Sequence, residues 1–114
     1  MIRGDVYQAN LNPTESSEQA GKRPVIIVSR DGINRSSPVV VIVPLTKFLP
    51  QKKIYPSHHL VKASSENGLK IDSIAKCEQI RAIAKSRLSD KLGRINTQDI
   101  EKIDRALKIV LSLG

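Results

Sequence analysis

Apolar positions along the chain follow two spacings, one typical of β-strands and one typical of an α-helix. From Val6 onward, apolar residues alternate with polar or small ones, which predicts a half-buried strand. Continuous apolar runs farther along predict buried strands, the first entered through Pro24 and the second stopped by Pro44. The predicted strands comprise residues 6–11, 25–29, 39–45, 58–63 and 73–83.

The segments between these strands are rich in turn-forming and polar residues. Residues 12–22 are predicted to form a long polar loop, and a loop of that length in a small domain is usually functional. Residues 31–38 are expected to form a turn region, and residues 47–56 a basic loop. Asn67-Gly68 is a further turn signal.

The C-terminal part changes to a helical period. Asn96 or Thr97 can cap a helix, with Asp99 and Glu101 in its first turn, where negative charge is favourable. The apolar face of this helix is formed by Ile100, Ile103, Leu107, Val110 and Leu111. Five or six short strands closed by one helix predict a small barrel-like α+β domain over residues 1–114.

The charge of the chain favours a polyanionic partner. The formal net charge is +8, and residues 51–85 hold seven Lys or Arg against three Asp or Glu, which is half of that excess. Aromatic residues are few, namely Tyr7, Phe48 and Tyr55, which counts against recognition of RNA mainly by base stacking.

Other features narrow the setting of the protein. The one cysteine, Cys77, cannot form a disulfide within the chain and is predicted to be a core residue. The N-terminus shows no signal peptide, and the apolar runs are too short to span a bilayer. We therefore expect a soluble, cytoplasmic protein without a membrane partner.

Common catalytic motifs are missing from the sequence. HExxH, CxxC, GxxxxGK[ST] and GxSxG do not occur, and His58 and His59 would face opposite sides of a strand. The sequence therefore supports neither a metal site nor a bound cofactor. Cleavage of RNA fits what remains, because the 2′-hydroxyl is an internal nucleophile and needs only acid–base help and charge stabilisation.

Several blocks of sequence resemble one known family. They are Gly4-Asp5-Val6-Tyr7, Asn12-Pro13-Thr14, Ser17-Glu18-Gln19-Ala20-Gly21-Lys22-Arg23-Pro24-Val25, Pro44-Leu45-Thr46, Asp72-Ser73 and Glu78-Gln79-Ile80-Arg81-Ala82-Ile83. With the amphipathic helix they cover essentially the whole chain, and they are similar to the MazF/PemK/Kid ribonuclease toxins. The resemblance implies an SH3-like barrel of five to seven short, mostly antiparallel strands with a C-terminal amphipathic α-helix.

The same resemblance implies an activity and partners. Members of the MazF/PemK/Kid family are homodimeric toxins of toxin–antitoxin pairs. They cut single-stranded RNA without a metal ion and leave a 2′,3′-cyclic phosphate and a 5′-hydroxyl. We expect the cognate antitoxin to carry an acidic, disordered C-terminal segment that lies across the RNA groove, because such a segment complements a basic enzyme.

The resemblance also assigns site residues. The catalytic Arg of the family falls on Arg23, its catalytic Thr on Thr46, and its acidic loop residue on Glu18, the candidate base. The predicted RNA-binding residues are Ser17, Gln19, Lys22, Lys47, Lys52, Lys53, His58, Glu78, Gln79 and Arg81. Two positions depart from the family, which commonly has Gly in place of Ser16 and in some members His in place of Lys22.

Alternative interpretations remain open at this point. Without the resemblance, Arg23 would be a salt-bridge residue at the barrel rim, Thr46 a strand terminus, and Glu18 a solvated loop charge. The same fold occurs in toxins that resemble the gyrase poison CcdB, which cleave nothing. A plain nucleic-acid-binding barrel is the third possibility.

Overall fold

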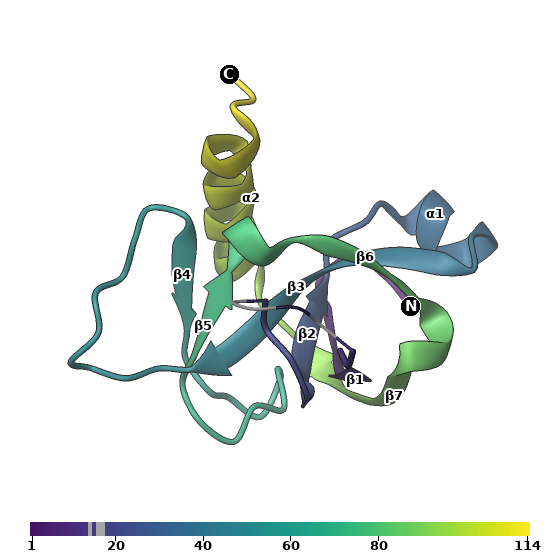
Figure 1. Cartoon of the computed structure of the whole chain (residues 1–114), viewed down its shortest axis with the longest axis horizontal. Helices are drawn as coiled ribbons and strands as arrows, with labels where there is room; N and C mark the ends of the chain where they lie inside the picture. Colours follow the sequence, from purple (N-terminus) through teal and green to yellow (C-terminus); the bar gives the residue numbers. More distant parts are fainter. Residues whose placement is uncertain (14, 16–17) are drawn as a thin grey trace.

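The chain forms a curled antiparallel sheet with one long helix packed against it (Figure 1), as described by a computed structural model that covers residues 1–13, 15 and 18–114. Its elements, in chain order, are β1 (Asp5–Asn10), β2 (Lys22–Ile27), α1 (Asp31–Ser36), β3 (Val39–Lys47), β4 (His58–Val61), β5 (Ser73–Lys76), η1 (Cys77–Gln79), β6 (Arg81–Ala84), η2 (Lys85–Arg87), β7 (Leu88–Arg94) and α2 (Thr97–Leu111).

β3 organises the sheet because it pairs with three other strands along its length. Its first half pairs with β6, its middle with β2, and its last residues with β5, all antiparallel. The path of paired strands runs β4-β5-β3-β2-β1-β7. The predicted α+β fold with short antiparallel strands and a C-terminal helix is confirmed, while the two ends of the path, β4 and β7, do not pair in the described part of the chain.

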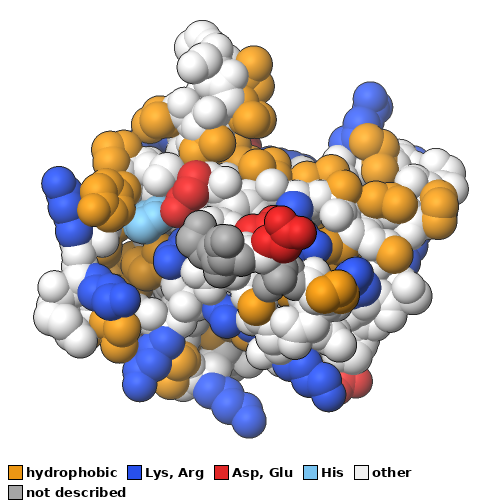
Figure 2. All heavy atoms as spheres, in the orientation of Figure 1, with side chains coloured by type: hydrophobic (Ala, Val, Ile, Leu, Met, Phe, Trp, Pro, Cys, Tyr) orange, Lys and Arg blue, Asp and Glu red, His pale blue; other side chains and the backbone are white. Residues whose placement is uncertain are grey.

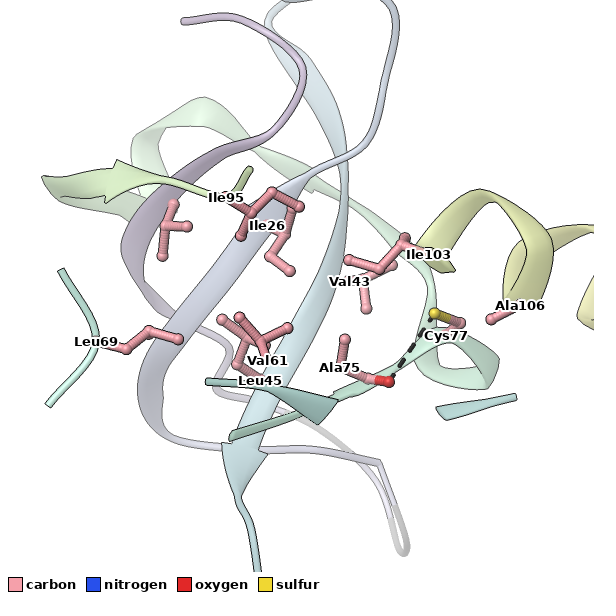
Figure 3. Close-up of a cluster of buried hydrophobic side chains, with 11 residues drawn as sticks. Ile26, Val43, Leu45, Val61, Leu69, Ala75, Cys77, Ile95, Ile103 and Ala106 are labelled. Atoms are coloured by element: carbon pink, nitrogen blue, oxygen red, sulfur yellow. Dashed lines mark hydrogen bonds between the residues drawn. The ribbon is translucent and has the colours of Figure 1, made fainter. Parts of the chain in front are cut away.

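The buried side chains form two clusters on opposite faces of the sheet. Ile26 and Val43 belong to the cluster under α2, together with Ile103 and Ala106 of that helix (Figure 3). Their neighbours on the same strands face the other way into the second cluster, made of Ala9, Leu11, Val25, Ile27, Val40, Ile42 and Ile83. Because residues 25–27 of β2 and 40–45 of β3 lie between the two clusters, these stretches are continuously apolar rather than alternating.

α2 is fixed at its N-terminus and projects beyond the sheet at its C-terminus (Figure 1). The side chain of Asn96, one of the two predicted caps, accepts a hydrogen bond from Asp99 N–H at 2.8 Å. Ile103 is buried as predicted, but Leu111, placed on the same face from the sequence, is about half exposed. Leu111 lies in the last turn, beyond the sheet. It is on the helix face that the apolar period predicts, but the sheet offers no surface there for it to pack against.

Three sequence predictions of local structure are wrong. Residues 31–36 form helix α1 and not a turn, held by Asn34, whose Nδ2 donates to Ser29 C=O at 2.8 Å. β3 continues through Pro44 to Lys47; the missing N–H is tolerated where β3 passes from β2 to β5. The predicted single strand over residues 73–83 is split by η1, which turns the chain between β5 and β6.

β7 is an unexpected strand, since it has only two apolar side chains, Leu88 and Leu92, and more than half of its residues are exposed. It is held by backbone contacts with the turn that contains Gly68, including Arg94 N–H to Glu66 C=O at 2.8 Å. A Cβ at Gly93 would lie 2.1 Å from Glu66 O, and one at Gly68 would lie 2.0 Å from Leu92 O. Only glycine permits this approach, so both positions are structural.

None of the helices in the described part of the chain is long and apolar enough to cross a bilayer.

Candidate functional site

Arg23 lies near the start of β2, and its side chain lines a cavity. Its Nε donates to Ala20 C=O at 2.8 Å, which ties the half-buried side chain to the end of the preceding loop. The cavity, here called the Arg23 cavity, measures about 600 Å³. It is lined by Gln8, Lys22, Arg23, Pro24, Leu45, Thr46, Lys47, Gly68, Leu69, Lys70, Ile71, Ser73 and Leu92.

Thr46 lies near the end of β3, opposite Ile74 of β5, and is half-buried. It lines the Arg23 cavity and also a second one of about 340 Å³, here called the Tyr55 cavity. The second cavity is lined by Thr46, Lys47, Phe48, Leu49, Lys52, Lys53, Ile54, Tyr55, His58, Ile74 and Lys76. Thr46 and Lys47 therefore separate two adjoining cavities, and the predicted catalytic pair of Arg23 and Thr46 shares one of them.

Both cavities are strongly basic. Lys22, Arg23, Lys47 and Lys70 line the Arg23 cavity, and no Asp or Glu of the described residues joins them. The Tyr55 cavity adds Lys52, Lys53 and Lys76, again without a described carboxylate in its lining. Figure 2 shows Lys and Arg side chains with apolar ones between them over the segment that connects β3 to β4. Uncompensated positive charge around two hollows suits a chain of phosphates.

The loop before β2 places its predicted residues differently. The carboxylate of Glu18 accepts a hydrogen bond from Glu15 N–H at 2.7 Å and does not line the Arg23 cavity. Gln19 is half-buried but lines neither cavity, whereas Lys22 lines the Arg23 cavity. Ser17 lies outside the described residues.

His58 is held in one orientation at the edge of the Tyr55 cavity. Its Nδ1 accepts a long hydrogen bond of 3.4 Å from Tyr55 N–H, so its Nε2 carries the proton that bonds Glu78 Oε2 at 3.0 Å. The rings of Tyr55 and His58 meet edge to face, with centroids 5.5 Å apart and planes at 86°. His59 points to the other side of β4, as expected, and its Nε2 lies 2.7 Å from Asp99 Oδ1 of α2.

The remaining predicted RNA-binding residues fall into two groups. Lys47, Lys52 and Lys53 line the Tyr55 cavity, and Lys53 Nζ lies 5.2 Å from the centroid of the Tyr55 ring. Gln79 and Arg81 line neither cavity. Arg81 Nη1 is buried and has no hydrogen-bond partner in the described part of the chain.

Sequence reasoning did not single out several lining residues. Lys70 follows the predicted Asn67-Gly68 turn, and its place in the lining of the Arg23 cavity arises only when that turn packs against β7. Lys76 stands between the apolar residues Ala75 and Cys77, and this isolated charge was the available signal. Phe48 and Tyr55 lay in the basic loop, and their rarity in the chain was the available signal.

Two titratable groups outside the cavities are structural. Burial and the neighbouring charge of Glu78 raise the pKa of Cys77 to about 12, so the thiol remains protonated in the core, as predicted for a core residue. Burial also opposes ionisation of Asp5, but hydrogen bonds from Ile2 N–H and Arg94 Nε, with the charge of Lys91, outweigh it. They hold the pKa of Asp5 below its usual value.

The residues that could bind a metal ion are dispersed. Within the ranges that the structure describes, no three His, Cys, Asp or Glu side chains come together as a group able to hold a metal ion.

Comparisons with known proteins converge on one family. Residues 2–111 match the model of the PemK-like, MazF-like toxins of type II toxin–antitoxin systems. The chain is 40% identical to the endoribonuclease EndoA of Bacillus subtilis, over 97% of this chain and 94% of that protein. It is 39% identical to the endoribonuclease MazF of Staphylococcus saprophyticus, over 99% of this chain and 92% of the relative.

Solved structures agree with this comparison. A mycobacterial endoribonuclease in complex with its cognate antitoxin is 27% identical and superposes with a TM-score of 0.81, covering 100% of this chain and 97% of that one. MazF of Deinococcus radiodurans, 19% identical, shares the fold with a TM-score of 0.84 over 99% and 97% of the two chains.

Proposed function

The chain belongs to the PemK-like, MazF-like toxins of type II toxin–antitoxin systems, and from this premise we propose that it cuts single-stranded RNA without a metal ion. Relatives that are 36–40% identical over nearly the full chain are named endoribonucleases. The observation that carries the proposal is the shared cavity of Arg23 and Thr46, surrounded by further cations.

In the proposed reaction the 2′-hydroxyl of one nucleotide attacks its own 3′-phosphate. A bond forms between the 2′-oxygen and phosphorus, and the bond from phosphorus to the 5′-oxygen of the next nucleotide breaks. The proton of the 2′-hydroxyl passes to a base, and one proton is delivered to the leaving oxygen. The products are a 2′,3′-cyclic phosphate and a 5′-hydroxyl.

Arg23 and Thr46 would stabilise the charge that builds up on phosphorus. The guanidinium of Arg23 stays protonated and offers several donors in one plane, which suits the equatorial oxygens of a phosphorane. The hydroxyl of Thr46 would donate to one of the same oxygens. Both side chains project from paired strands, so they meet the substrate with little reorganisation, and such donors typically contribute a factor of roughly 10²–10³ to the rate.

Glu18 is the proposed base. Its carboxylate is bonded to Glu15 N–H, so it must leave that hydrogen bond to reach a 2′-hydroxyl in the Arg23 cavity. The RNA on either side of the cut would be bound by Gln19, by Lys22 at the rim of the Arg23 cavity, and by Glu78, Gln79 and Arg81. Ser17 is proposed for the same role.

The proposed partners follow from the same charges and from the relatives. We propose inhibition by a cognate antitoxin whose acidic C-terminal segment lies across the two basic cavities; a mycobacterial relative forms a complex with its cognate antitoxin. A homodimer of single-domain chains and a cytoplasmic location are part of this proposal. One domain is supported by β2 and β3, whose side chains contribute to both core clusters.

One experiment tests the reaction. The purified protein is incubated with a long single-stranded RNA in EDTA, and the chemistry of the cut ends is determined. Cleavage that leaves 2′,3′-cyclic phosphate ends, and that fails when a 2′-deoxynucleotide stands at the cut site, is expected. Cleavage that EDTA abolishes and Mg²⁺ restores would contradict the mechanism. Binding without cleavage would favour the plain nucleic-acid-binding barrel, and no effect on RNA together with inhibition of gyrase would favour a CcdB-like toxin.

A further inference from the structure

The loop between β1 and β2 is closed at its base by hydrogen bonds. Leu11 N–H donates to Gly21 C=O at 3.0 Å, and the side-chain oxygen of Asn12 accepts from Gly21 N–H at 3.0 Å. Leu11 is fully buried in the second core cluster, and Gly21 has a φ of +79°, a conformation that favours glycine. Residues 11–12 and 20–21, here called the loop stem, therefore hold the two ends of the loop together.

Arg87 binds the loop stem from a distant part of the sequence. It is the last residue of η2, directly before β7, and the pairing of β7 with β1 brings it to the end of β1 (Figure 1). Its Nη1 donates to Asn12 C=O and, at 3.2 Å, to Asn10 C=O. One guanidinium nitrogen thus binds the carbonyls on both sides of the buried Leu11, and hydrogen bonds from a charged donor are stronger than neutral ones.

The loop stem is bonded in turn to the side chain of Arg23. The carbonyl oxygen of Ala20, next to Gly21, accepts the hydrogen bond of Arg23 Nε at 2.8 Å. Because the guanidinium is planar and rigid, a bond at Nε restricts how its terminal nitrogens are turned. Those nitrogens carry the donors that the proposed reaction offers to the phosphorane. A shift of the stem would move the Ala20 carbonyl, and with it these donors.

We propose that Arg87 and Asn12 are positioning residues for Arg23. They fix the loop stem, the stem fixes the carbonyl of Ala20, and this carbonyl orients the guanidinium in the Arg23 cavity. The inference rests on the proposed ribonuclease function, in which Arg23 stabilises the phosphorane. Neither Arg87 nor Asn12 lines the Arg23 cavity or the Tyr55 cavity, so their effect on the reaction would pass through the stem and not through a contact with the phosphate.

The first measurement separates positioning from RNA binding. Single-turnover cleavage of a defined RNA over a range of protein concentrations gives the maximal rate constant and the half-saturating concentration. Arg87→Ala and Asn12→Ala should each lower the maximal rate constant by roughly 10- to 100-fold, because a small misplacement of a reacting group can cost that much. The half-saturating concentration should stay nearly unchanged. If it rises while the maximal rate constant is that of the wild type, these residues bind RNA directly and the inference is wrong.

Conservative variants separate the hydrogen bonds from charge and from folding. Asn12→Asp keeps an acceptor for Gly21 N–H and should restore most of the rate, and Arg87→Lys keeps a charged donor and should restore part of it. Lys85→Ala removes a charge from the same short helix η2 and should cut RNA like the wild type. A loss as large as that of Arg87→Ala would assign the effect to charge alone. If Arg87→Ala does not fold, Asn12→Ala and its rescue by Asn12→Asp decide the question.

A combined variant tests whether the effect passes through Arg23. In the Arg23→Ala protein no guanidinium remains to be oriented, so adding Arg87→Ala should slow cleavage little further. Rate losses that multiply in full would mean that Arg87 acts on another part of the reaction, which contradicts the inference.

A measurement without RNA separates this inference from the ribonuclease function. The Nε–H proton of Arg23 can be followed by NMR and is assigned by its loss in Arg23→Lys. Its exchange with solvent should become about fivefold faster in Arg87→Ala and in Asn12→Ala, the effect of one ordinary hydrogen bond, and should not change in Lys85→Ala. Unchanged exchange in both stem variants would overturn the inference. If exchange responds as expected but the wild-type protein never cleaves RNA, the positioning stands and the ribonuclease function fails.

Discussion

The Arg23 cavity and the Tyr55 cavity share Thr46 and Lys47 but are built from different parts of the chain. Arg23 and Thr46 project from β2 and β3, which pair with each other and carry the residues of both core clusters. The Tyr55 cavity is formed largely by residues 48–57, which connect β3 to β4 and are mostly exposed, and by His58 at the start of β4. Chemistry is thus assigned to rigid strand positions, and contacts to further phosphates of the RNA are assigned to the cationic side chains of a connecting segment.

The largest effect on RNA cleavage is expected for the two strand residues of the Arg23 cavity, Arg23 and Thr46. Arg23→Ala and Thr46→Ala should each lower the rate constant of RNA cleavage by roughly 10²–10³, because each removes one preorganised donor to the phosphorane. Neither side chain belongs to a core cluster, so the thermal midpoint should change little. Arg35→Ala on α1, which removes an exposed charge, is the matched control and should cut RNA like the wild type. If Arg23→Ala cuts RNA at the wild-type rate, the catalytic site does not lie in the Arg23 cavity.

A smaller effect is expected for the lysines of the connecting segment. Lys52→Gln and Lys53→Gln should weaken RNA binding and leave the rate constant of the bound complex nearly unchanged. Each lost phosphate contact should reduce the slope of log affinity against log salt by about 0.7, the value for single-stranded nucleic acid. Titrations at several salt concentrations measure this, with Lys102→Gln on the exposed side of α2 as control. Equal slopes for all variants would mean that these lysines do not contact phosphates.

A positioning effect is expected for Glu78. Glu78→Ala removes the acceptor of His58 Nε2 at the edge of the Tyr55 cavity, so the affinity for single-stranded RNA should fall about fivefold, the effect of one ordinary hydrogen bond. Glu78→Gln keeps an acceptor and should restore most of the affinity. Glu101→Ala on α2 removes the same charge far from the ring and should change nothing; a loss as large as that of Glu78→Ala would point to charge alone.

The smallest effect on cleavage is expected at Asp5, which lies outside both cavities. Asp5→Asn should cut RNA at the wild-type rate per folded molecule but lower the free energy of unfolding by about 2 kcal/mol at neutral pH, since it weakens hydrogen bonds to a buried carboxylate. Because the pKa of Asp5 is lowered in the folded protein, its contribution is complete above the unfolded pKa of about 3.9 and is lost as pH falls through the folded value.

Denaturant unfolding at a series of pH values measures this difference in stability. The gap between the wild type and Asp5→Asn should shrink below about pH 4, where the unfolded carboxyl begins to bind a proton. A gap that is constant down to strongly acidic pH would show that ionisation of Asp5 does not stabilise the fold.

The parts of the fold that could be predicted are those with a strong apolar pattern. β2 and β3 read as continuous apolar runs because they face both core clusters, and the 3.6-residue period of α2 comes from the residues that it buries, such as Ile103. β7 was not predicted, because it is held by backbone hydrogen bonds and by the close approach of the chain at Gly93. Apolar side chains contribute little to holding it. α1 has six residues, too few to show a period.

The same contrast applies to the site. Arg23 and Thr46 could be named from the family resemblance, and the pairing of β2 with β3 explains why residues far apart in the sequence line one cavity. Lys70 could not be named, because its place in the lining of the Arg23 cavity depends on how the turn at Asn67-Gly68 folds. Resemblance finds residues that a family shares, whereas the binding surface particular to this chain requires its geometry.

The most direct measurement is a double-mutant cycle on Arg23 and Thr46, with single-turnover cleavage of a defined single-stranded RNA in EDTA. If both side chains stabilise one phosphorane in one cavity, their effects overlap. Arg23→Ala/Thr46→Ala should then be only a few-fold slower than the slower single variant. Rate losses that multiply in full would show that the two residues act independently, which contradicts a shared catalytic cavity.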